Sequence, residues 1–301
     1  MKKTVLILGA SGRFGHNSAE AFEKAGWSVR RFDRKSQDLT QAAWGTKLIV
    51  NAWNPLYPDW SKDVPHLTQQ VINVARKTGA AVLIPGNVYN FGADAPPPWG
   101  EESRQMARNP LGRIRIDMEQ AYKDSGVRTI ILRAGDFIDT QPSGNWFDLA
   151  LIKKLDKGIF TYPGNPDIPH AWAYLPDLAR VSVGLAEQGD QLPTFANVHF
   201  PGYTLTGHEM RQALERVTGS SLKMRRFSYL PFHLARPFWP LGAKLLEMRY
   251  LWSTPHWLTG EHLHEILPEF RSTPLEIALA SAIKPHSVEG EIDPDKAMAA
   301  G

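Results

Sequence analysis

The sequence predicts an α/β fold in which a doubly wound parallel sheet is followed by a small, mainly helical C-terminal lobe. Short apolar runs rich in β-branched residues alternate with stretches of helical spacing, and strand signals become rare after about residue 215. The 301 residues suffice for one large domain or for a main domain with a smaller lobe. With 43% hydrophobic and 22% charged residues, the composition is that of an ordinary globular chain.

The N-terminal segment carries the clearest pattern. Residues 4–8 form a continuous apolar run of the kind found in strands that are covered on both faces. This run leads into the loop GASGRFG at residues 9–15, whose glycines follow a GxxGxxG spacing. Residues 13–25 then show helical spacing, and Gly26 is expected to end that helix. A second strand is predicted over residues 27–32.

Strand, glycine loop, helix, strand and a closing acid, Asp33, together make a Rossmann-type dinucleotide-binding unit. Glycines let the backbone approach a pyrophosphate, and the helix N-terminus offers free amides and partial positive charge. A corner that uses its glycines for geometry alone is the alternative, and the flanking strands favour cofactor binding. The loop residues expected to bind the cofactor are Gly9, Ser11, Gly12, Arg13, Phe14 and Gly15.

The choice of cofactor depends on two opposing features near the second strand. Asp33 suits the free ribose diol of NAD and would repel a 2′-phosphate. Arg13, Arg30, Arg31 and Arg34 could clamp that phosphate, or they could form a solvated basic edge. We therefore expect NAD(P), with a slight preference for NADP.

Further strands are predicted at residues 47–52 and 80–84, with a helix over residues 64–77 between them. The expected domains are a dinucleotide-binding Rossmann domain over residues 1–136 with residues 175–196 returning to it, a substrate lobe over residues 137–174 and 197–285, and a loose tail over residues 286–301.

Composition excludes several classes of function. The absence of cysteine removes disulfides, thiolate metal sites and cysteine nucleophiles, and it favours a cytoplasmic protein. A net charge of +3 is too small for a nucleic-acid footprint, and no apolar run reaches the roughly 18 residues of a membrane span. We expect no metal and no nucleic-acid or membrane partner. The expected partner is a small-molecule substrate, with a homodimer as one option.

Segment 222–257 mixes aromatic residues, prolines and scattered basic residues. One interpretation is an amphipathic helix with a basic face that lies on a membrane surface. Pro231, Pro237 and Pro240 would break such a helix, so a lobe packed over the active site is the preferred interpretation.

Several motifs resemble those of extended or atypical short-chain dehydrogenases/reductases of the NAD-dependent epimerase/dehydratase kind. The resemblance covers about residues 1–215 and is carried by GASGRFG, Asp38-Leu39, Asn51-Ala52-Trp53, GNVYNFG at 86–92, NPLGRIR at 109–115, IILRAGD at 130–136, WAYLPDLA at 172–179 and residues 197–209. The resemblance implies further cofactor contacts from Asp38, Leu39, Ala52, Trp53, Pro85, Gly86 and Arg115.

The chain departs from this family at the catalytic positions. The family uses a tyrosine to move the substrate proton, a lysine four positions later and a nearby serine or threonine. Here Leu111 stands at the tyrosine position, Arg115 at the lysine position, and Pro85 and Gly86 in the serine region. Leucine cannot transfer a proton, and arginine stays charged. The alternatives are relocated chemistry, an activated substrate that needs no strong acid, or a sensor without turnover.

For relocated chemistry, Tyr89 is the first candidate proton donor, with Asn87 and Arg115 beside it in the expected catalytic set. Its alternative role is packing or ligand positioning. His170 could do acid–base work or be a hydrogen-bonded structural histidine. Asp136 could bind substrate hydroxyls or cap a turn.

Tryptophan is unusually frequent, with 10 copies. Five of them (Trp53, Trp60, Trp99, Trp146 and Trp172) fall at predicted strand ends or in loops, where they could line one flat-walled pocket or anchor loops. The expected substrate contacts are Trp53, Trp99, Asp136, Trp146, His170 and Trp172.

The function expected from these features is that of an NAD(P)-dependent oxidoreductase or epimerase-like enzyme acting on a small organic substrate. The alternative is a non-catalytic NAD(P)-binding sensor or regulatory protein.

Overall fold

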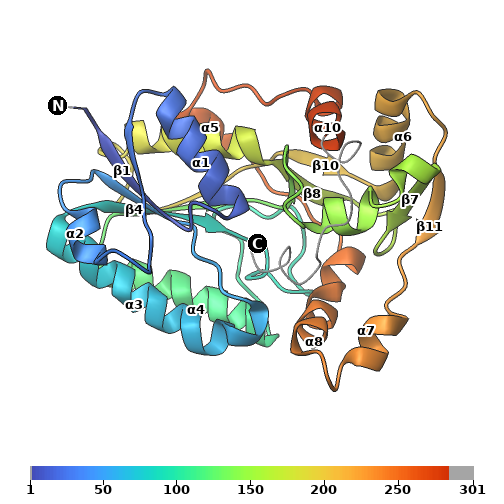
Figure 1. The fold of residues 1–301 in the computed structure, drawn as a ribbon, viewed down its shortest axis with the longest axis horizontal. Coiled ribbons are helices and arrows are strands. Elements are labelled where there is room, and N and C mark those ends of the chain that lie inside the picture. Colours follow the sequence, from blue (N-terminus) through green and yellow to red (C-terminus); the bar gives the residue numbers. More distant parts are fainter. Residues whose placement is uncertain (1, 285–301) are drawn as a thin grey trace.

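The computed structural model describes residues 2–284 and is built on a six-stranded parallel sheet (Figure 1). The strand order β2-β1-β3-β4-β5-β9 reverses between β1 and β3, as in doubly wound sheets. This confirms the predicted fold class. The strands are β1 (Thr4–Leu8), β2 (Ser28–Arg31), β3 (Leu48–Asn51), β4 (Ala81–Gly86), β5 (Thr129–Arg133) and β9 (Phe195–His199).

Helices cover both faces of this sheet. The helices α1 (Arg13–Lys24) and α5 (Leu175–Glu187) pack together on one face, and α3 (Trp60–Thr78) and α4 (Pro110–Ser125) pack on the other (Figure 1). The short helix α2 (Leu39–Ala43) lies against α3.

Strand β1 shows why the sheet needs two covered faces. Val5 and Ile7 belong to the apolar cluster that contains α1 and α5, whereas Leu6 and Leu8 belong to the cluster with α3 and α4. All four side chains are fully buried. Successive side chains of a strand point to opposite faces of the sheet, so a strand that is apolar throughout requires helices on both faces.

A second region holds two small sheets and a third apolar cluster. One sheet has the order β10-β8-β6 and the other pairs β11 with β7. The strands are β6 (Asp136–Ile138), β7 (Ile159–Tyr162), β8 (His170–Tyr174), β10 (Tyr203–Leu205) and β11 (Lys223–Arg226). The helices α6 (Gly207–Thr218) and α10 (Leu275–Ile283) contribute to this cluster. The remaining C-terminal helices are α7 (Leu230–Ala235), α8 (Pro240–Glu247) and α9 (Glu261–Ile266), and α9 packs against β9 of the main sheet.

Four short helical turns complete the described elements: η1 (Tyr57–Asp59), η2 (Phe147–Leu151), η3 (Leu155–Lys157) and η4 (Met248–Ser253). The division into a cofactor domain and a substrate lobe stays a prediction, and β9 spans the boundary expected at residue 196. The expected loose tail, 286–301, lies outside the described residues. In the described part of the chain, no helix is both long enough and apolar enough to cross a membrane.

A buried ion pair joins the helix α4 to the sheet. Arg133 Nη2 lies 2.6 Å from Glu119 Oε2, and both side chains are almost completely buried. The other guanidinium contacts go to the Asn87 carbonyl oxygen at 2.6 Å and to Asn197 Oδ1 at 3.2 Å. Arg133 thereby fixes the loop after β4, the strand β9 and the helix α4 to one another.

Two histidines are buried without a charged partner. His199 Nδ1 donates to the Trp99 carbonyl oxygen at 3.1 Å, and His256 Nδ1 donates to the Thr254 carbonyl oxygen at 2.8 Å. Burial lowers the pKa of each side chain to about 3. Both histidines are therefore neutral in the folded protein at physiological pH.

This burial predicts acid lability. The folded pKa values lie below the ordinary value of 6.5, so the unfolded chain binds protons that the folded chain excludes. The stabilisation is complete above pH 6.5 and is lost as the pH falls from there towards 3. At about pH 5, burial of each neutral histidine should lower the free energy of unfolding by about 2 kcal/mol relative to its value at neutral pH.

Urea unfolding at several pH values tests this. His256→Phe keeps a ring against Trp99 and should reduce the pH dependence by about 2 kcal/mol. His16→Gln, at a half-exposed side chain, should not change it. Equal pH dependence in wild type and His256→Phe would contradict the prediction.

Candidate functional site

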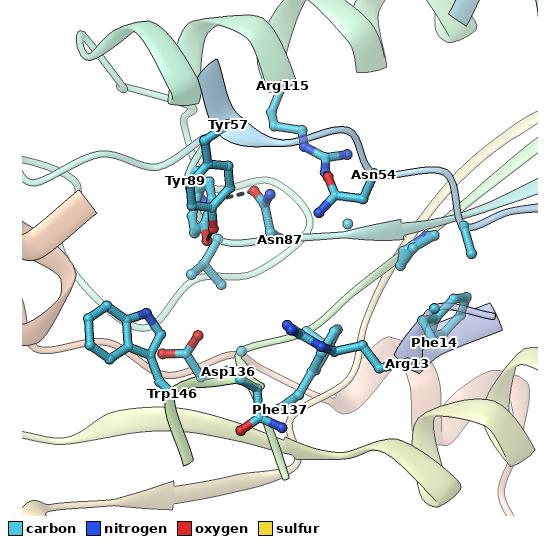
Figure 2. A pocket seen from close by; sticks show the side chains of 18 of the residues that line it. Arg13, Phe14, Asn54, Tyr57, Asn87, Tyr89, Arg115, Asp136, Phe137 and Trp146 are labelled. Carbon is cyan, nitrogen blue, oxygen red and sulfur yellow. Dashed lines mark hydrogen bonds between the residues drawn. The ribbon is translucent and has the colours of Figure 1, made fainter. Parts of the chain in front are cut away.

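A central cavity opens at the carboxyl ends of β1, β3, β4 and β5, the place where open parallel sheets bind ligands (Figure 2). We use "central cavity" for the space lined by Gly12, Arg13, Phe14, Asn51–Asn54, Tyr57, Trp60, Pro85–Tyr89, Arg115, Ala134–Phe137, Gly144–Trp146 and Leu245. The loops after β1, β3, β4 and β5 therefore meet here.

The glycine loop is tight where it meets the helix α1. Gly9 has φ +74°, and a Cβ added at Gly15 would lie only 2.1 Å from the Gly9 carbonyl oxygen. Gly12 occupies the N-cap of α1, and no side chain caps that end. Gly12, Arg13 and Phe14 line the central cavity, while Ser11 is exposed outside it. The loop thus presents backbone amides and a helix N-terminus to the cavity.

Arg13 extends from this loop across the cavity (Figure 2). Its guanidinium donates to the Ser143 carbonyl oxygen, with Nη2 at 2.8 Å and Nε at 3.2 Å. Burial lowers its pKa, but from a value so high that the side chain stays charged.

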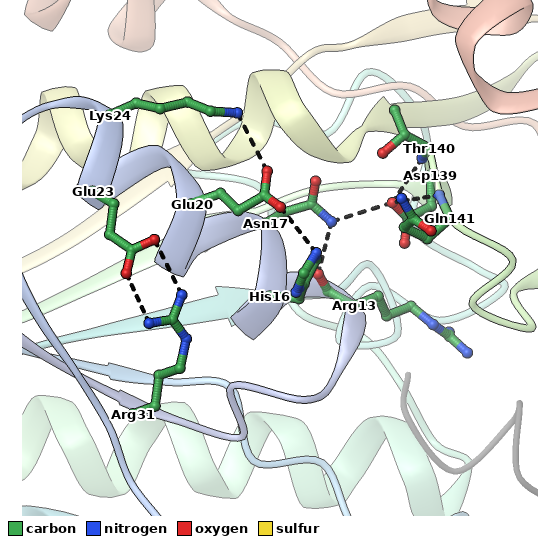
Figure 3. Close-up of polar contacts among 10 residues, drawn as sticks. All are labelled: Arg13, His16, Asn17, Glu20, Glu23, Lys24, Arg31, Asp139, Thr140 and Gln141. Carbon is green, nitrogen blue, oxygen red and sulfur yellow. Dashed lines mark hydrogen bonds and ion pairs between the residues drawn. The ribbon is translucent and has the colours of Figure 1, made fainter.

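One turn further along α1, Asn17 Nδ2 donates to Asp139 Oδ1 at 3.2 Å (Figure 3). Asp139 also accepts from the Thr140 amide at 2.7 Å. The contacts of Arg13 and Asn17 therefore tie the glycine loop to the segment that follows β6.

A pair of tyrosine hydroxyls forms one wall of the cavity. The oxygens of Tyr57 and Tyr89 are 2.6 Å apart (Figure 2). Burial raises the pKa of both side chains, and for Tyr89 the neighbouring Tyr57 and Asp136 add to the rise. Both hydroxyls are therefore protonated at neutral pH, so they can donate hydrogen bonds but cannot act as bases.

Tyr57 is missing from the residues predicted by the sequence. It comes five positions after the strand predicted over residues 47–52, beyond a loop that contains Pro55, and only its place behind a strand end could have indicated it. Asn87 supports the pair, because its Oδ1 accepts from the Tyr89 amide at 3.1 Å.

Arg115 reaches the cavity from α4. Its Nη2 donates to Asn54 Oδ1 at 3.0 Å, and its guanidinium lies 4.3 Å from the centre of the Trp60 ring. Burial lowers its pKa, and its Nε is buried without a hydrogen-bond partner. Leu111, one turn earlier, is fully buried, so no proton-transferring side chain occupies that position.

A carboxylate faces the tyrosine pair from the opposite wall. Asp136 points into the cavity (Figure 2), and its Oδ2 lies 2.8 Å from His170 Nε2. His170 is 2% exposed and stacks on Trp252 at 4.4 Å. Because a carboxylate can only accept, the hydrogen in this bond belongs to His170. His170 holds Asp136 from behind and does not itself line the cavity.

The central cavity includes three of the five candidate tryptophans, Trp53, Trp60 and Trp146. Trp99 lies elsewhere, stacked between Phe91 at 4.5 Å and His256 at 5.0 Å, and its Nε1 donates to the Ala95 carbonyl oxygen.

Trp172 also lies outside the cavity, because it occupies β8, which is paired on both sides and buried in the third cluster. Trp99 and Trp172, which were expected to contact the substrate, therefore pack inside the protein and do not line the central cavity.

The acidic residues near β2 have local partners. Asp33 is exposed, and its carboxylate accepts from the Lys35 amide at 3.0 Å and from Ser36 Oγ at 2.6 Å. Asp38 caps α2 by accepting from the Gln41 amide at 2.8 Å. Leu39 is buried in the cluster beneath. None of Asp33, Asp38 and Leu39 lines the central cavity.

The arginines of this region differ in their bonding partners. Arg31 pairs with Glu23 at 2.7 Å (Figure 3), and Arg30 donates to the carbonyl oxygens of Ala42 and Trp44. Arg34 lies with its guanidinium 5.3 Å from the centre of the ring of Trp53, a residue that lines the cavity.

Among residues 2–284, no three His, Asp or Glu side chains lie close enough together to hold a metal ion.

Comparison by sequence finds no matching protein-family model and no matching curated protein. Comparison by structure finds close folds. MoeE5 in complex with UDP-glucose and NAD superposes with a TM-score of 0.72 at 15% identity, covering 94% of this chain and 98% of that one.

UDP-glucose 4-epimerase from Brucella ovis in complex with NAD gives a TM-score of 0.70 at 17% identity, covering 94% of this chain and 98% of the other. A dTDP-4-dehydrorhamnose reductase from Clostridium acetobutylicum gives 0.68 at 15% identity, with 95% and 100% covered. The chain therefore shares the fold of these three structures.

Proposed function

We propose that the protein is an NAD(P)-dependent oxidoreductase or epimerase-like enzyme that acts on a small organic substrate in the central cavity. One observation carries the proposal: the uncapped N-terminus of α1 and its glycine loop open into the same cavity as Tyr57, Tyr89 and Asp136. A dinucleotide site and groups able to handle a proton therefore share one space.

The glycine loop fits a dinucleotide. The Gly9 conformation and the close approach of Gly15 bring the backbone to the position where a pyrophosphate would rest, and the uncapped helix end favours negative charge there. Gly12, Arg13 and Phe14 would hold the pyrophosphate, with Ala52, Trp53, Pro85 and Gly86 along the rest of the cofactor. When bound, NAD(P) would supply the hydride acceptor or donor.

The adenosine end supports a preference for NADP. The Asp33 carboxylate already accepts hydrogen bonds from the Lys35 amide and Ser36 Oγ, which weakens the argument for NAD. The side chains of Arg31 and Arg30 are bonded to Glu23 and to carbonyl oxygens, whereas the Arg34 guanidinium lies over Trp53, which lines the cavity. We therefore assign the 2′-phosphate contact to Arg34.

Asp136 is the proton acceptor in this proposal. In the oxidation of a substrate alcohol, the hydrogen on the carbon that bears the hydroxyl would leave as a hydride for NAD(P) to accept, and the hydroxyl proton would pass to the Asp136 carboxylate. His170 keeps that carboxylate oriented through the 2.8 Å bond. The Tyr57–Tyr89 pair donates a hydrogen bond to the reacting oxygen of the substrate. Arg115 holds the neighbouring ribose or an anionic group of the substrate.

The second candidate function is an NAD(P)-binding sensor without turnover. It is supported by the buried Leu111 and by Arg115 at the positions where the resembled family has its tyrosine and lysine. A cytoplasmic location, a homodimer and a small-molecule partner also belong to the proposal. The absence of cysteine supports the location.

Cofactor binding is tested by thermal shift with NAD, NADH, NADP and NADPH. A dinucleotide at about 100 times its dissociation constant should stabilise the protein by about 2.7 kcal/mol. Gly15→Ala should lose this shift and some stability, because its Cβ meets the Gly9 carbonyl oxygen. Gly189→Ala, where the nearest atom is 3.3 Å away, is the matched control. No shift with any of the four dinucleotides would overturn the proposal.

The cofactor preference is tested by titration of NADPH and NADH. Arg34→Ala should weaken NADPH binding about tenfold and leave NADH binding unchanged, because only NADPH carries the 2′-phosphate. Arg31→Ala, whose side chain is paired with Glu23, should change neither affinity. Equal loss for both cofactors in Arg34→Ala would contradict the assigned contact.

The proton acceptor is tested by turnover. The first substrates to assay are UDP-glucose, UDP-glucuronic acid and dTDP-4-dehydrorhamnose, which the structural relatives suggest. Asp136→Asn should lower the rate about a hundredfold or more with dinucleotide affinity preserved. Asp167→Asn, at an exposed side chain, is the control. Full activity in Asp136→Asn would remove Asp136 from the mechanism, and dinucleotide binding with no turnover on any substrate would favour the sensor.

A further inference from the structure

A second surface of the molecule lies away from the cofactor sheet. Helix α7 projects at the edge of the structure, at the lower right of Figure 1, and connects to β11 on one side and to α8 on the other. We use "tip" for residues 223–249, which contain these three elements. Neither the fold nor the proposed reaction accounts for its surface.

The tip exposes large apolar side chains at intervals of four residues. Leu230 is 63% exposed, Leu234 71% and Phe238 91%. The other large apolar side chains exposed among the described residues, Trp44, Leu56 and Ile277, are scattered one by one. Single exposed apolar residues are ordinary, but a row of three on a projecting element indicates a surface that meets something apolar.

The same tip is strongly basic. It contains six lysines and arginines (Lys223, Arg225, Arg226, Arg236, Lys244 and Arg249) and one acidic residue, Glu247. Glu247 is paired with Lys244 at 2.9 Å and is largely buried. The whole chain, in contrast, is nearly balanced, with 34 basic and 31 acidic residues. Positive charge is thus concentrated beside the apolar row.

Basic and apolar groups share one depression at the base of the tip. Arg226, His233 and Arg249 line it together with Leu230. Tyr229 lies in its wall, 93% buried, with its hydroxyl unpartnered and the Arg249 guanidinium 4.6 Å from the centre of its ring. Two guanidinium groups, an imidazole and a buried hydroxyl donor around one hollow are suited to an anionic oxygen group such as a phosphate.

We propose that the tip docks the protein on an anionic phospholipid surface. Leu230, Leu234 and Phe238 enter the boundary between headgroups and acyl chains, and the flanking arginines contact lipid phosphates. A second copy of the chain fits less well, because two tips of the same charge repel each other. This contact needs no spanning helix, so it is compatible with the absence of one among residues 2–284.

Co-sedimentation of the full chain with vesicles tests the proposal. Binding should be strong to phosphatidylcholine vesicles that contain phosphatidylglycerol, weak to pure phosphatidylcholine vesicles, and reduced by high salt. The triple variant Leu230→Ser/Leu234→Ser/Phe238→Ser should lose binding at least tenfold. Arg225→Glu/Arg236→Glu should lose about as much, with dinucleotide thermal shifts unchanged in both variants.

Two control variants remove exposed apolar side chains elsewhere. Trp44→Ser and Ile277→Ser should bind vesicles as the wild type does. Vesicle binding that is absent, or that is independent of lipid charge, would overturn the proposal. So would a wild-type dimer that the triple serine variant converts to a monomer without any effect on vesicles, because a second copy would then be the occupant.

Discussion

The buried Arg133–Glu119 pair is the interaction on which the rest of the site depends. It joins β5 to α4 in the centre of the molecule, and Arg133 also holds the Asn87 carbonyl oxygen and Asn197. A buried charge pair contributes little net stability, but removing one partner costs several kcal/mol, about 3–5 in known cases. Its consequence here is positional, because α4 carries Arg115 and the Asn87 loop carries Tyr89.

The cavity that results has an unusual division of charge. The guanidinium groups of Arg13 and Arg115 reach the cavity from the glycine loop and from α4. The Tyr57 and Tyr89 hydroxyls lie on one wall, and the Asp136 carboxylate lies on the other. The missing tyrosine and lysine of the resembled family leave a buried leucine and a fixed cation in their place. In the proposed reaction, Asp136 is therefore the group that accepts the proton, and His170 on the neighbouring strand β8 holds its carboxylate through the 2.8 Å bond.

Local patterns predicted the sheet and the glycine loop correctly, because the apolar runs, the glycines at 9, 12 and 15 and the stop at Gly79 act through nearby residues. Contacts between distant segments were not predictable. Tyr57 and Tyr89 are far apart in the sequence and come into contact only in the folded chain. The buried Trp99 indole donates its hydrogen bond to the Ala95 carbonyl oxygen. The two small sheets were also missed, because they pair segments far apart in the sequence, such as β11 with β7 and β10 with β8.

The central claim, that a dinucleotide binds in the central cavity lined by Trp53, Trp60 and Trp146, is tested most directly by energy transfer. Tryptophan excitation should produce sensitised nicotinamide emission when NADPH or NADH is added, and Trp146→Phe should weaken it while Trp44→Phe, at an exposed side chain outside the cavity, should not. Sensitised emission that is absent with both cofactors, or that falls equally in the two variants, would contradict the account.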